Sequence, residues 1–330
     1  MSASLRSGSG MPHLALSPRG RAPRLLPSPR DGREDARLTS SYGGMIVRQA
    51  STSSLQQMAT GMVSLAKLND SHVKLRDPTL NILVLGAPQV GKSMFINAFR
   101  TAVTNNAKWP SAAVGICGFY GTTTVEPFPN HPTEPTWLCI DTPGRFYEPR
   151  DKPVLEKLVA GIPWKTKLAG VKAMTANEVE DLTPIAANKA HQCVIVVPAN
   201  DLIEDLGWSN SLLWRNRYAP ACDAENVVFY CKSLVSTLRG LLDDNSPFFL
   251  ISKMDKIGGA DNWEARHAIN TLMSQCVPSN RIYYGAFPEE RATIATGRRM
   301  ELDSSTRDGL LHLHEDLCLS VQWNKRIDTM

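Results

Sequence analysis

The sequence has 330 residues, enough for one large domain or two small ones, and 42% of them are hydrophobic, as expected for a globular core. The formal net charge is only +4, and residues 1–50 hold eight arginines against three acids. The rest of the chain is close to neutral, so we expect no nucleic-acid surface on the folded part. No apolar stretch approaches the roughly 20 residues that cross a bilayer, so we expect no transmembrane segment.

The first 76 residues differ in composition from the rest of the chain. Residues 1–50 are rich in Ser, Pro, Gly and Arg, which predicts a disordered basic tail. Residues 51–76 are predicted to be a short amphipathic helix and a linker, because apolar residues follow helical spacing at Leu55, Met58, Met62, Leu65 and Leu68. Seven cysteines without CxxC pairs favour a cytoplasmic protein, and an Arg- and Ser-rich organellar signal is the alternative.

From residue 79 onward, short apolar runs alternate with helical segments, which is typical of an α/β protein with a parallel sheet. The predicted strands are 80–85, 123–128, 136–140, 193–197, 247–251 and 281–284. We therefore expect residues 77–330 to form a three-layer α/β/α P-loop NTPase domain, or G domain, around a mostly parallel six-stranded sheet.

Helices are expected between these strands. Pro153 opens one that ends at Gly161, and apolar stripes predict two more over 227–238 and 310–321. Asp261 followed by Glu264 is interpreted as the capping box of a further helix. The stretch 161–191 has no clear assignment.

A GxxxxGK[ST] pattern lies directly after the first predicted strand and before a helix. It comprises Gly86, Ala87, Pro88, Gln89, Val90, Gly91, Lys92 and Ser93, and Met94 follows at the same nucleotide site. Such a loop curls its N–H groups around a phosphate, beside the positive end of the helix dipole. We expect Lys92 to reach the β- and γ-phosphates and Ser93 to ligate Mg²⁺. The alternative is a Gly-containing turn that happens to carry Lys-Ser.

The third predicted strand ends in Asp141-Thr142-Pro143-Gly144, a DxxG pattern. Asp141 is expected to hold Mg²⁺ through water, and Gly144 to offer its N–H to the γ-phosphate. Alone, this tetrapeptide is also a common turn.

Three adjacent threonines lie between these two motifs and supply hydroxyls for a mobile switch. We assign Thr123 to Mg²⁺ and the γ-phosphate, with Thr122 as the second choice. Three threonines are also simply good strand formers.

The fifth predicted strand ends in Ser252-Lys253-Met254-Asp255, a variant of the guanine-reading Asn-Lys-x-Asp. The Asp255 carboxylate can accept from the guanine N1–H and N2–H₂, which adenine does not supply, and the Lys253 stem would lie over the base. Because Ser252 is shorter than Asn, we expect a looser tie to the P-loop, which affects affinity rather than base choice. Gly285 and Ala286, after the last strand, are assigned to guanine O6.

In this order the motifs resemble the translation-factor-like (TRAFAC) class of P-loop GTPases over most of residues 78–325. The threonines after Gly121, the 154–161 helix and the 193–197 strand are similar to the GTPase domain of the interferon-induced protein 44 family. That resemblance implies GTP binding, with dimerisation through the G domain or a defence-type role.

One departure concerns hydrolysis. Arg145 follows DxxG where many small GTPases carry a water-orienting Gln. A guanidinium is no base, so we expect slow Mg²⁺-dependent hydrolysis of GTP to GDP, with Arg145 stabilising charge or a regulatory protein or second copy supplying the missing group. The alternatives are a GTP-binding scaffold without turnover and a P-loop ATPase or kinase.

Overall fold

The computed structural model describes residues 79–105, 112, 114, 121–207, 217–287 and 300–327. The tail predicted over 1–50 and the helix predicted within 51–76 lie outside the described residues. The six predicted strands all fall within them.

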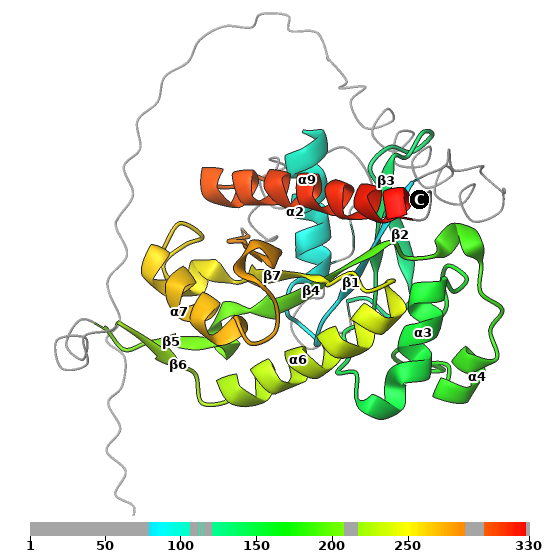
Figure 1. Cartoon of the computed structure of the whole chain (residues 1–330), viewed down its shortest axis with the longest axis horizontal. Helices are drawn as coiled ribbons and strands as arrows, with labels where there is room; N and C mark the ends of the chain where they lie inside the picture. Colours follow the sequence, from blue (N-terminus) through cyan, green and yellow to red (C-terminus); the bar gives the residue numbers. More distant parts are fainter. Residues whose placement is uncertain are drawn as a thin grey trace, which may run out of the picture. The chain divides into compact units, whose positions relative to one another are not determined.

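The main sheet is mixed and has six strands in the order β2-β3-β1-β4-β7-β8 (Figure 1). In it β2 runs antiparallel to β3, and the other neighbouring pairs are parallel. The strands are β1 (Leu80–Leu85), β2 (Glu126–Pro129), β3 (Trp137–Asp141), β4 (Gln192–Pro198), β7 (Phe248–Ser252) and β8 (Ile282–Tyr284). The predicted mostly parallel six-stranded sheet is confirmed, and the predicted bounds differ by one to three residues at most ends.

Helices cover both faces of this sheet (Figure 1). On one face α2 and α9 pack through a cluster that includes Phe99 and Leu313. On the other face α3, α6 and α7 pack through a cluster that includes Leu155, Leu234 and Ile269. The helices are α2 (Lys92–Thr104), α3 (Lys152–Ala160), α4 (Ala176–Glu180), α6 (Ala224–Leu241), α7 (Trp263–Met273) and α9 (Ser304–Ile327).

The central strands explain where a site can form. Every residue of β1 and β4 is buried, as expected for parallel strands covered on both faces. Because parallel strands share one direction, the loops after β1, β3, β4 and β7 gather at the carboxyl edge of the sheet, where α/β proteins bind ligands. The motifs singled out in the sequence follow three of these strands.

The predicted capping box at Asp261 and Glu264 is wrong. Helix α7 begins at Trp263, and its N-cap is Asn262, whose side chain accepts a hydrogen bond from the Ala265 N–H. Asp and Asn are about equally good N-caps, so residue type alone does not choose between two neighbours.

Two segments without a sequence assignment carry structure. Helix α4 begins with a capping box between Thr175 and Glu178, and Lys167 forms a β-bridge with Thr124. A separate two-stranded hairpin joins β5 (Ile203–Asp205) to β6 (Tyr218–Pro220). It follows the short 3₁₀ turn η3 (Ala199–Asp201) at the carboxyl end of β4.

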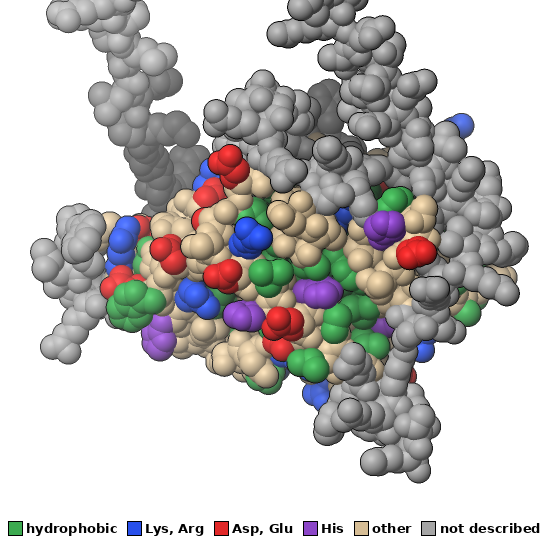
Figure 2. Space-filling view, turned by 90° about the horizontal axis from the view of Figure 1, so that it is seen from above, with side chains coloured by type: hydrophobic (Ala, Val, Ile, Leu, Met, Phe, Trp, Pro, Cys, Tyr) green, Lys and Arg blue, Asp and Glu red, His purple; other side chains and the backbone are tan. Residues whose placement is uncertain are grey.

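The surface seen from the α9 side has a mixed character (Figure 2). Acidic, basic and histidine side chains lie interspersed with apolar ones, and no single charge sign spreads across the side chains described there. Within the described ranges, no helix is long and apolar enough to cross a membrane.

Candidate functional site

The segment Gly86–Ser93 (loop 86–93) connects β1 to α2 in a backbone shape that requires glycine. Gly86 and Gly91 have φ angles of 149° and 100°, and Gln89 between them has 61°. A Cβ on Gly86 would lie 2.6 Å from the Val196 carbonyl oxygen of β4. Left-handed residues interspersed in a turn before a helix N-terminus form anion-binding concavities. Met94 lies in the first turn of α2.

Lys92 is buried although it carries an ammonium group, with 6% of its surface exposed. Its Nζ donates to the carbonyl oxygens of Gly86, at 3.1 Å, and Ala87, at 3.0 Å. Burial lowers the pKa of Lys92 to about 8, an effect that the Asp141 carboxylate opposes. No carboxylate of the described residues lies within ion-pair distance of the Lys92 ammonium. Its partners are neutral carbonyl groups, so its positive charge is available to an anion bound in loop 86–93.

Three oxygen-bearing side chains meet where α2 begins. The hydroxyls of Ser93 and Thr122 each donate to Oδ2 of Asp141 at 2.8 Å, and they lie 3.1 Å from each other. Oδ1 of Asp141 is buried and accepts no hydrogen bond from any described residue. A buried carboxylate oxygen without a donor is costly, so this cluster is incomplete without a further positive or donating group.

The cluster fits a magnesium ion. Burial raises the pKa of Asp141, while its bonds to Ser93 and Thr122 and the charge of Lys92 oppose that rise. Mg²⁺ prefers oxygen ligands and is bound by one or two protein groups together with substrate phosphates. No group of three or more His, Cys, Asp or Glu side chains in the described part of the chain forms an all-protein metal cage. Two hydroxyls and a carboxylate with one unbonded oxygen match the kind of Mg²⁺ site that is formed jointly by protein groups and substrate phosphates.

The segment after Asp141 packs directly on loop 86–93. The Thr142 hydroxyl donates to the Val84 carbonyl at 2.6 Å, and the Arg145 N–H donates to the Gly86 carbonyl at 3.2 Å. A Cβ on Gly144 would collide with Cα of Pro88, so only glycine fits this approach. The structure thus brings the predicted DxxG segment against the predicted phosphate loop.

Of the neighbouring threonines, the second choice lies at the cluster. The hydroxyl bonded to Asp141 belongs to Thr122, whereas the Thr123 carbonyl accepts from the N–H groups of Leu168 and Ala169. A Cβ on Gly170 would lie 3.5 Å from the Thr123 methyl group, so the Thr123 side chain lies beside Gly170.

The Ser252–Asp255 segment is tied to loop 86–93, and the prediction of a loose tie is wrong. The buried Ser252 hydroxyl donates to the Val90 carbonyl at 2.6 Å. The short serine side chain reaches the loop because the two segments lie close together. A Cβ on Gly91 would lie only 3.8 Å from the Ser252 side chain.

Beyond Ser252 the chain turns to present an acid at the surface. Lys253 has a left-handed φ of 56° and starts the 3₁₀ turn η4 (Met254–Ile257). The Asp255 side chain is 41% exposed, and its ion pair is with the adjacent Lys256 at 3.8 Å. Its carboxylate is accessible to a ligand, unlike that of Asp141.

Gly285 and Ala286 lie beside this turn, but their N–H groups are engaged. The Gly285 carbonyl accepts from the Met254 N–H at 3.2 Å. The Gly285 N–H donates to the Ile251 carbonyl at 2.8 Å, and the Ala286 N–H donates to the Thr306 hydroxyl at 3.0 Å. A role toward a base oxygen would require one of these bonds to be exchanged.

A cavity of about 700 Å³ adjoins loop 86–93 on the side of β4 and α6. Phe146 and Tyr230 contribute to its wall, with ring centroids 5.6 Å apart. Its lining includes Gly86 and Val90 but not the lysine, hydroxyls and carboxylates described above. The cavity is therefore a neighbour of the polar cluster and not its centre.

No family model matches this sequence. No curated protein matches it either. Among solved structures, the chain is similar to a mutation variant of SsGBP at 12% identity and a TM-score of 0.31, covering 82% of this chain and 65% of that one. It is similar to LeoA, a bacterial dynamin GTPase from ETEC, at 16% identity and a TM-score of 0.33, covering 85% of this chain and 46% of that one.

The chain spans less than two thirds of the length of both structures. One of the two is named as a GTPase. At these identities and TM-scores the likeness says nothing about the activity of this chain.

Proposed function

We propose that this protein binds guanine nucleotides with Mg²⁺ through a P-loop formed by loop 86–93. The observation that carries the proposal is the meeting of Ser93, Thr122 and Asp141 beside the buried ammonium of Lys92. A ligand that satisfies both features has to bring negative charge to the loop and a hard cation to the open carboxylate oxygen. A nucleotide di- or triphosphate with Mg²⁺ does both.

Each side chain has a role in this proposal. Lys92 would exchange its two carbonyl partners for β- and γ-phosphate oxygens, and Gly144 would offer its N–H to the γ-phosphate. The Ser93 and Thr122 hydroxyls and the Asp141 carboxylate would hold the cation, Asp141 through water. When bound, Mg²⁺ neutralises charge on the phosphates. Thr123, the first choice from the sequence, stays a candidate if the switch segment rearranges on binding.

Base choice falls to the turn after β7. The accessible carboxylate of Asp255 would accept from the guanine N1–H and N2–H₂, and the Lys253 stem would cover the ring. The bond from Ser252 to Val90 fixes this turn to loop 86–93, so the groups that would bind the base and those that would bind the phosphates lie at a fixed distance from each other. Gly285 and Ala286 remain proposed contacts of O6.

Hydrolysis to GDP is proposed to be slow. The Arg145 guanidinium forms an ion pair with the buried carboxylate of Asp151 at the start of α3, and it does not replace a water-orienting Gln. A regulatory protein or a second copy of the chain would supply the missing group, in line with the resemblance to the interferon-induced protein 44 family. Single-turnover hydrolysis that is equally fast in dilute and concentrated protein would count against self-association.

A nucleotide-binding scaffold without turnover is the second candidate. The same Arg145–Asp151 pair favours it, because the side chain that follows DxxG is engaged by Asp151 and is not free to orient a water. An ATPase or kinase is disfavoured because neither would use the Ser252 tie or the accessible Asp255.

The test is a competition titration of fluorescent GDP by GTP, GDP and ATP, with Mg²⁺ and with EDTA. We expect guanine-selective binding that Mg²⁺ strengthens, and loss of the Mg²⁺ effect in Asp141→Asn. Asp243→Asn is the matched control, because Asp243 is an exposed acid paired with Lys189 far along the chain from the cluster. Binding that is indifferent to both base and Mg²⁺ would refute the proposal.

A further inference from the structure

The proposed guanine-reading acid, Asp255, lies in a turn that needs an external support. The turn η4 is four residues long and follows a left-handed residue. Its internal bonds run from Lys256 N–H to the Lys253 carbonyl, at 3.0 Å, and from the N–H groups of Gly258 and Gly259 to the Met254 carbonyl, the latter at 2.8 Å. A 3₁₀ turn of this length has poor hydrogen-bond geometry, so contacts from elsewhere contribute to fixing it. The Met254 N–H at its start donates to the Gly285 carbonyl, and side chains hold its other end.

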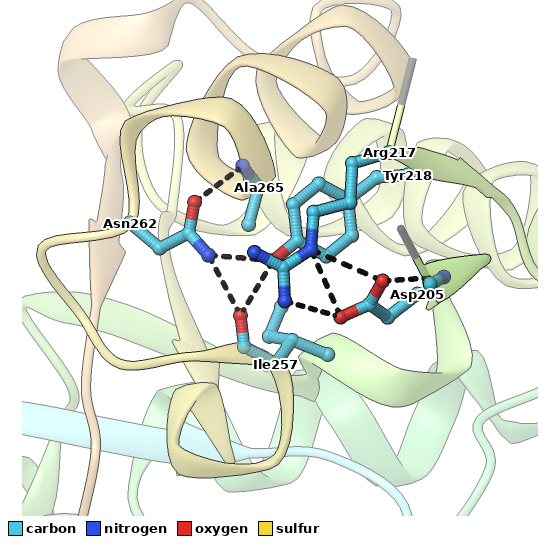
Figure 3. Close-up of polar contacts among 7 residues, drawn as sticks. Asp205, Arg217, Tyr218, Ile257, Asn262 and Ala265 are labelled. Carbon is cyan, nitrogen blue, oxygen red and sulfur yellow. Dashed lines mark hydrogen bonds and ion pairs between the residues drawn. The ribbon is translucent and has the colours of Figure 1, made fainter. Parts of the chain in front are cut away.

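Two side chains from outside the turn hold its last carbonyl group (Figure 3). The Tyr218 hydroxyl donates to the Ile257 oxygen at 3.1 Å, and Nδ2 of Asn262 donates to the same oxygen at 2.9 Å. Nδ2 of Asn262 also donates to the Tyr218 hydroxyl oxygen at 2.6 Å. The three groups form a closed triangle of hydrogen bonds at the end of η4.

Both amide protons and the amide oxygen of Asn262 are engaged in hydrogen bonds. Its amide nitrogen has two protons, which go to Tyr218 and Ile257, and its Oδ1 accepts from the Ala265 N–H as the N-cap of α7. Gly258, with φ of 96°, lets the chain pass over this amide, since a Cβ there would lie 2.7 Å from Nδ2. The turn with Asp255 is thereby fixed to a helix end.

Tyr218 brings a second element to the same turn. It lies in β6, paired with Asp205 in β5, and the residue is 6% exposed. Beside it, the Arg217 guanidinium binds both oxygens of Asp205, and lies 5.4 Å from the Tyr218 ring centroid (Figure 3). The Arg217–Asp205 ion pair therefore stabilises the β5–β6 hairpin next to the residue that contacts η4.

We propose that Tyr218 and Asn262 are positioning residues for guanine selectivity, which they control by fixing η4 and hence the Asp255 carboxylate. The inference rests on the proposed guanine-nucleotide function and names residues outside the nucleotide motifs. The β5–β6 hairpin then supports the base-reading turn. A substitution in the hairpin would alter the selectivity for guanine although the hairpin does not contact the nucleotide.

The experiment compares affinities for GDP and ADP in the full chain, by competition against fluorescent GDP. Tyr218→Phe removes the hydroxyl and keeps the ring, and Asn262→Ser removes the amide donors and keeps a good N-cap. Each variant removes two of the three hydrogen bonds of the triangle. We expect each to lower the GDP-to-ADP affinity ratio about fivefold, which corresponds to one weakened hydrogen bond between guanine and Asp255. ADP affinity should stay unchanged, because Lys92 and Ser93 are untouched.

Tyr284→Phe is the matched control. Tyr284 is also buried, and its hydroxyl bonds the same helix α7 through the Arg266 carbonyl and Oδ1 of Asn270, away from η4. It should lower thermal stability about as much as Tyr218→Phe and leave the affinity ratio as in the wild type.

The outcomes separate this inference from the function on which it rests. A wild-type preference for GDP, together with an unchanged ratio in Tyr218→Phe and Asn262→Ser, overturns the positioning role alone. A lowered ratio in Tyr284→Phe as well overturns it too, because the effect would then follow stability. A wild type without guanine preference removes both claims.

Discussion

The proposed phosphate side of the candidate site, which is loop 86–93 with Asp141, and the proposed base side, which is the turn at Asp255, are built in opposite ways. Lys92 and Asp141 are buried, with 6% and 1% of their surfaces exposed, and they are surrounded by groups of the loop and the sheet. Asp255 is exposed and pairs only with its neighbour Lys256 among the described residues. The difference indicates that the phosphate side is preformed by the sheet, whereas the base side depends on the turn that carries it.

The electrostatics of the two sides differ for the same reason. Burial lowers the pKa of Lys92 and raises that of Asp141, so the charged form of each is disfavoured until a ligand balances it. The Asp255 side chain lies at the surface instead, with 41% of it exposed. Changes on the phosphate side should therefore alter binding as a whole, and changes on the base side should alter selectivity.

The largest effect is expected for Lys92→Ala. Removing the buried ammonium deletes charge-assisted bonds to two phosphates, so affinity for every nucleotide should fall about 100-fold or more. Fluorescent GDP and ATP titrations measure it. Lys189→Ala, an exposed lysine paired with Asp243, is the control and should bind as the wild type does. Retained binding in Lys92→Ala would show that loop 86–93 is not the phosphate site.

Asp255→Asn should act on selectivity instead. The variant loses a carboxylate that accepts two guanine donors, so GDP affinity should fall about 30-fold while ADP affinity stays the same. Competition by GDP and ADP measures both. Equal losses for the two nucleotides would mean that Asp255 supports the fold and does not read the base.

Ser252→Ala tests the connection between the two sides. It leaves the buried Val90 carbonyl of loop 86–93 without its 2.6 Å donor, so affinity for both nucleotides should fall about tenfold. The GDP-to-ADP ratio should be retained, because Tyr218 and Asn262 still hold η4. The same competition titrations measure both quantities. A loss of the ratio, with affinity for ADP unchanged, would place Ser252 on the base side alone.

The pH dependence of binding tests the state of Lys92. Phosphate needs the ammonium form, and the pKa of Lys92 is about 8 in the unliganded protein, so affinity should fall as pH rises through that value. Between pH 7 and 8.5 the loss should be about fourfold, with proton uptake on binding at the upper end. Calorimetry in two buffers of different ionisation enthalpy measures the uptake. An affinity that is flat over this range contradicts a buried, pKa-lowered lysine at the phosphates.

Arg145→Ala should have the smallest effect. Its guanidinium pairs with Asp151, so single-turnover GTP hydrolysis and GDP affinity should each change by less than about threefold. A much larger loss of hydrolysis, with binding intact, would show that Arg145 leaves Asp151 to stabilise the transition state.

The sequence predicted the sheet well because its signals are local. Continuous apolar runs such as Leu80–Leu85 and Phe248–Ser252 indicate buried parallel strands, and the GxxxxGK[ST] pattern fixes the loop between β1 and α2. The bounds of β2 were less accurate. Thr122 turns to Asp141 and Thr124 bridges Lys167, so the strand starts only at Glu126.

The features that the sequence did not predict depend on contacts distant along the chain. The reach of Ser252 to Val90 follows from the closeness of two backbones that are 162 residues apart. Tyr218 meets Ile257 across 39 residues and Asn262 across 44, with no spacing pattern to mark them. Residue type predicted roles for Lys92, Asp141 and Asp255, but the side chains that hold them in place are visible only in the fold.

The most direct test of a single guanine-nucleotide site is calorimetric titration of the wild-type chain with GDP and with ADP in Mg²⁺. We expect one GDP per chain and an affinity for GDP about 30-fold or more above that for ADP, since only guanine satisfies Asp255. Equal affinities, or no heat with GDP, would contradict the claim that loop 86–93 and the turn at Asp255 form the two halves of one site.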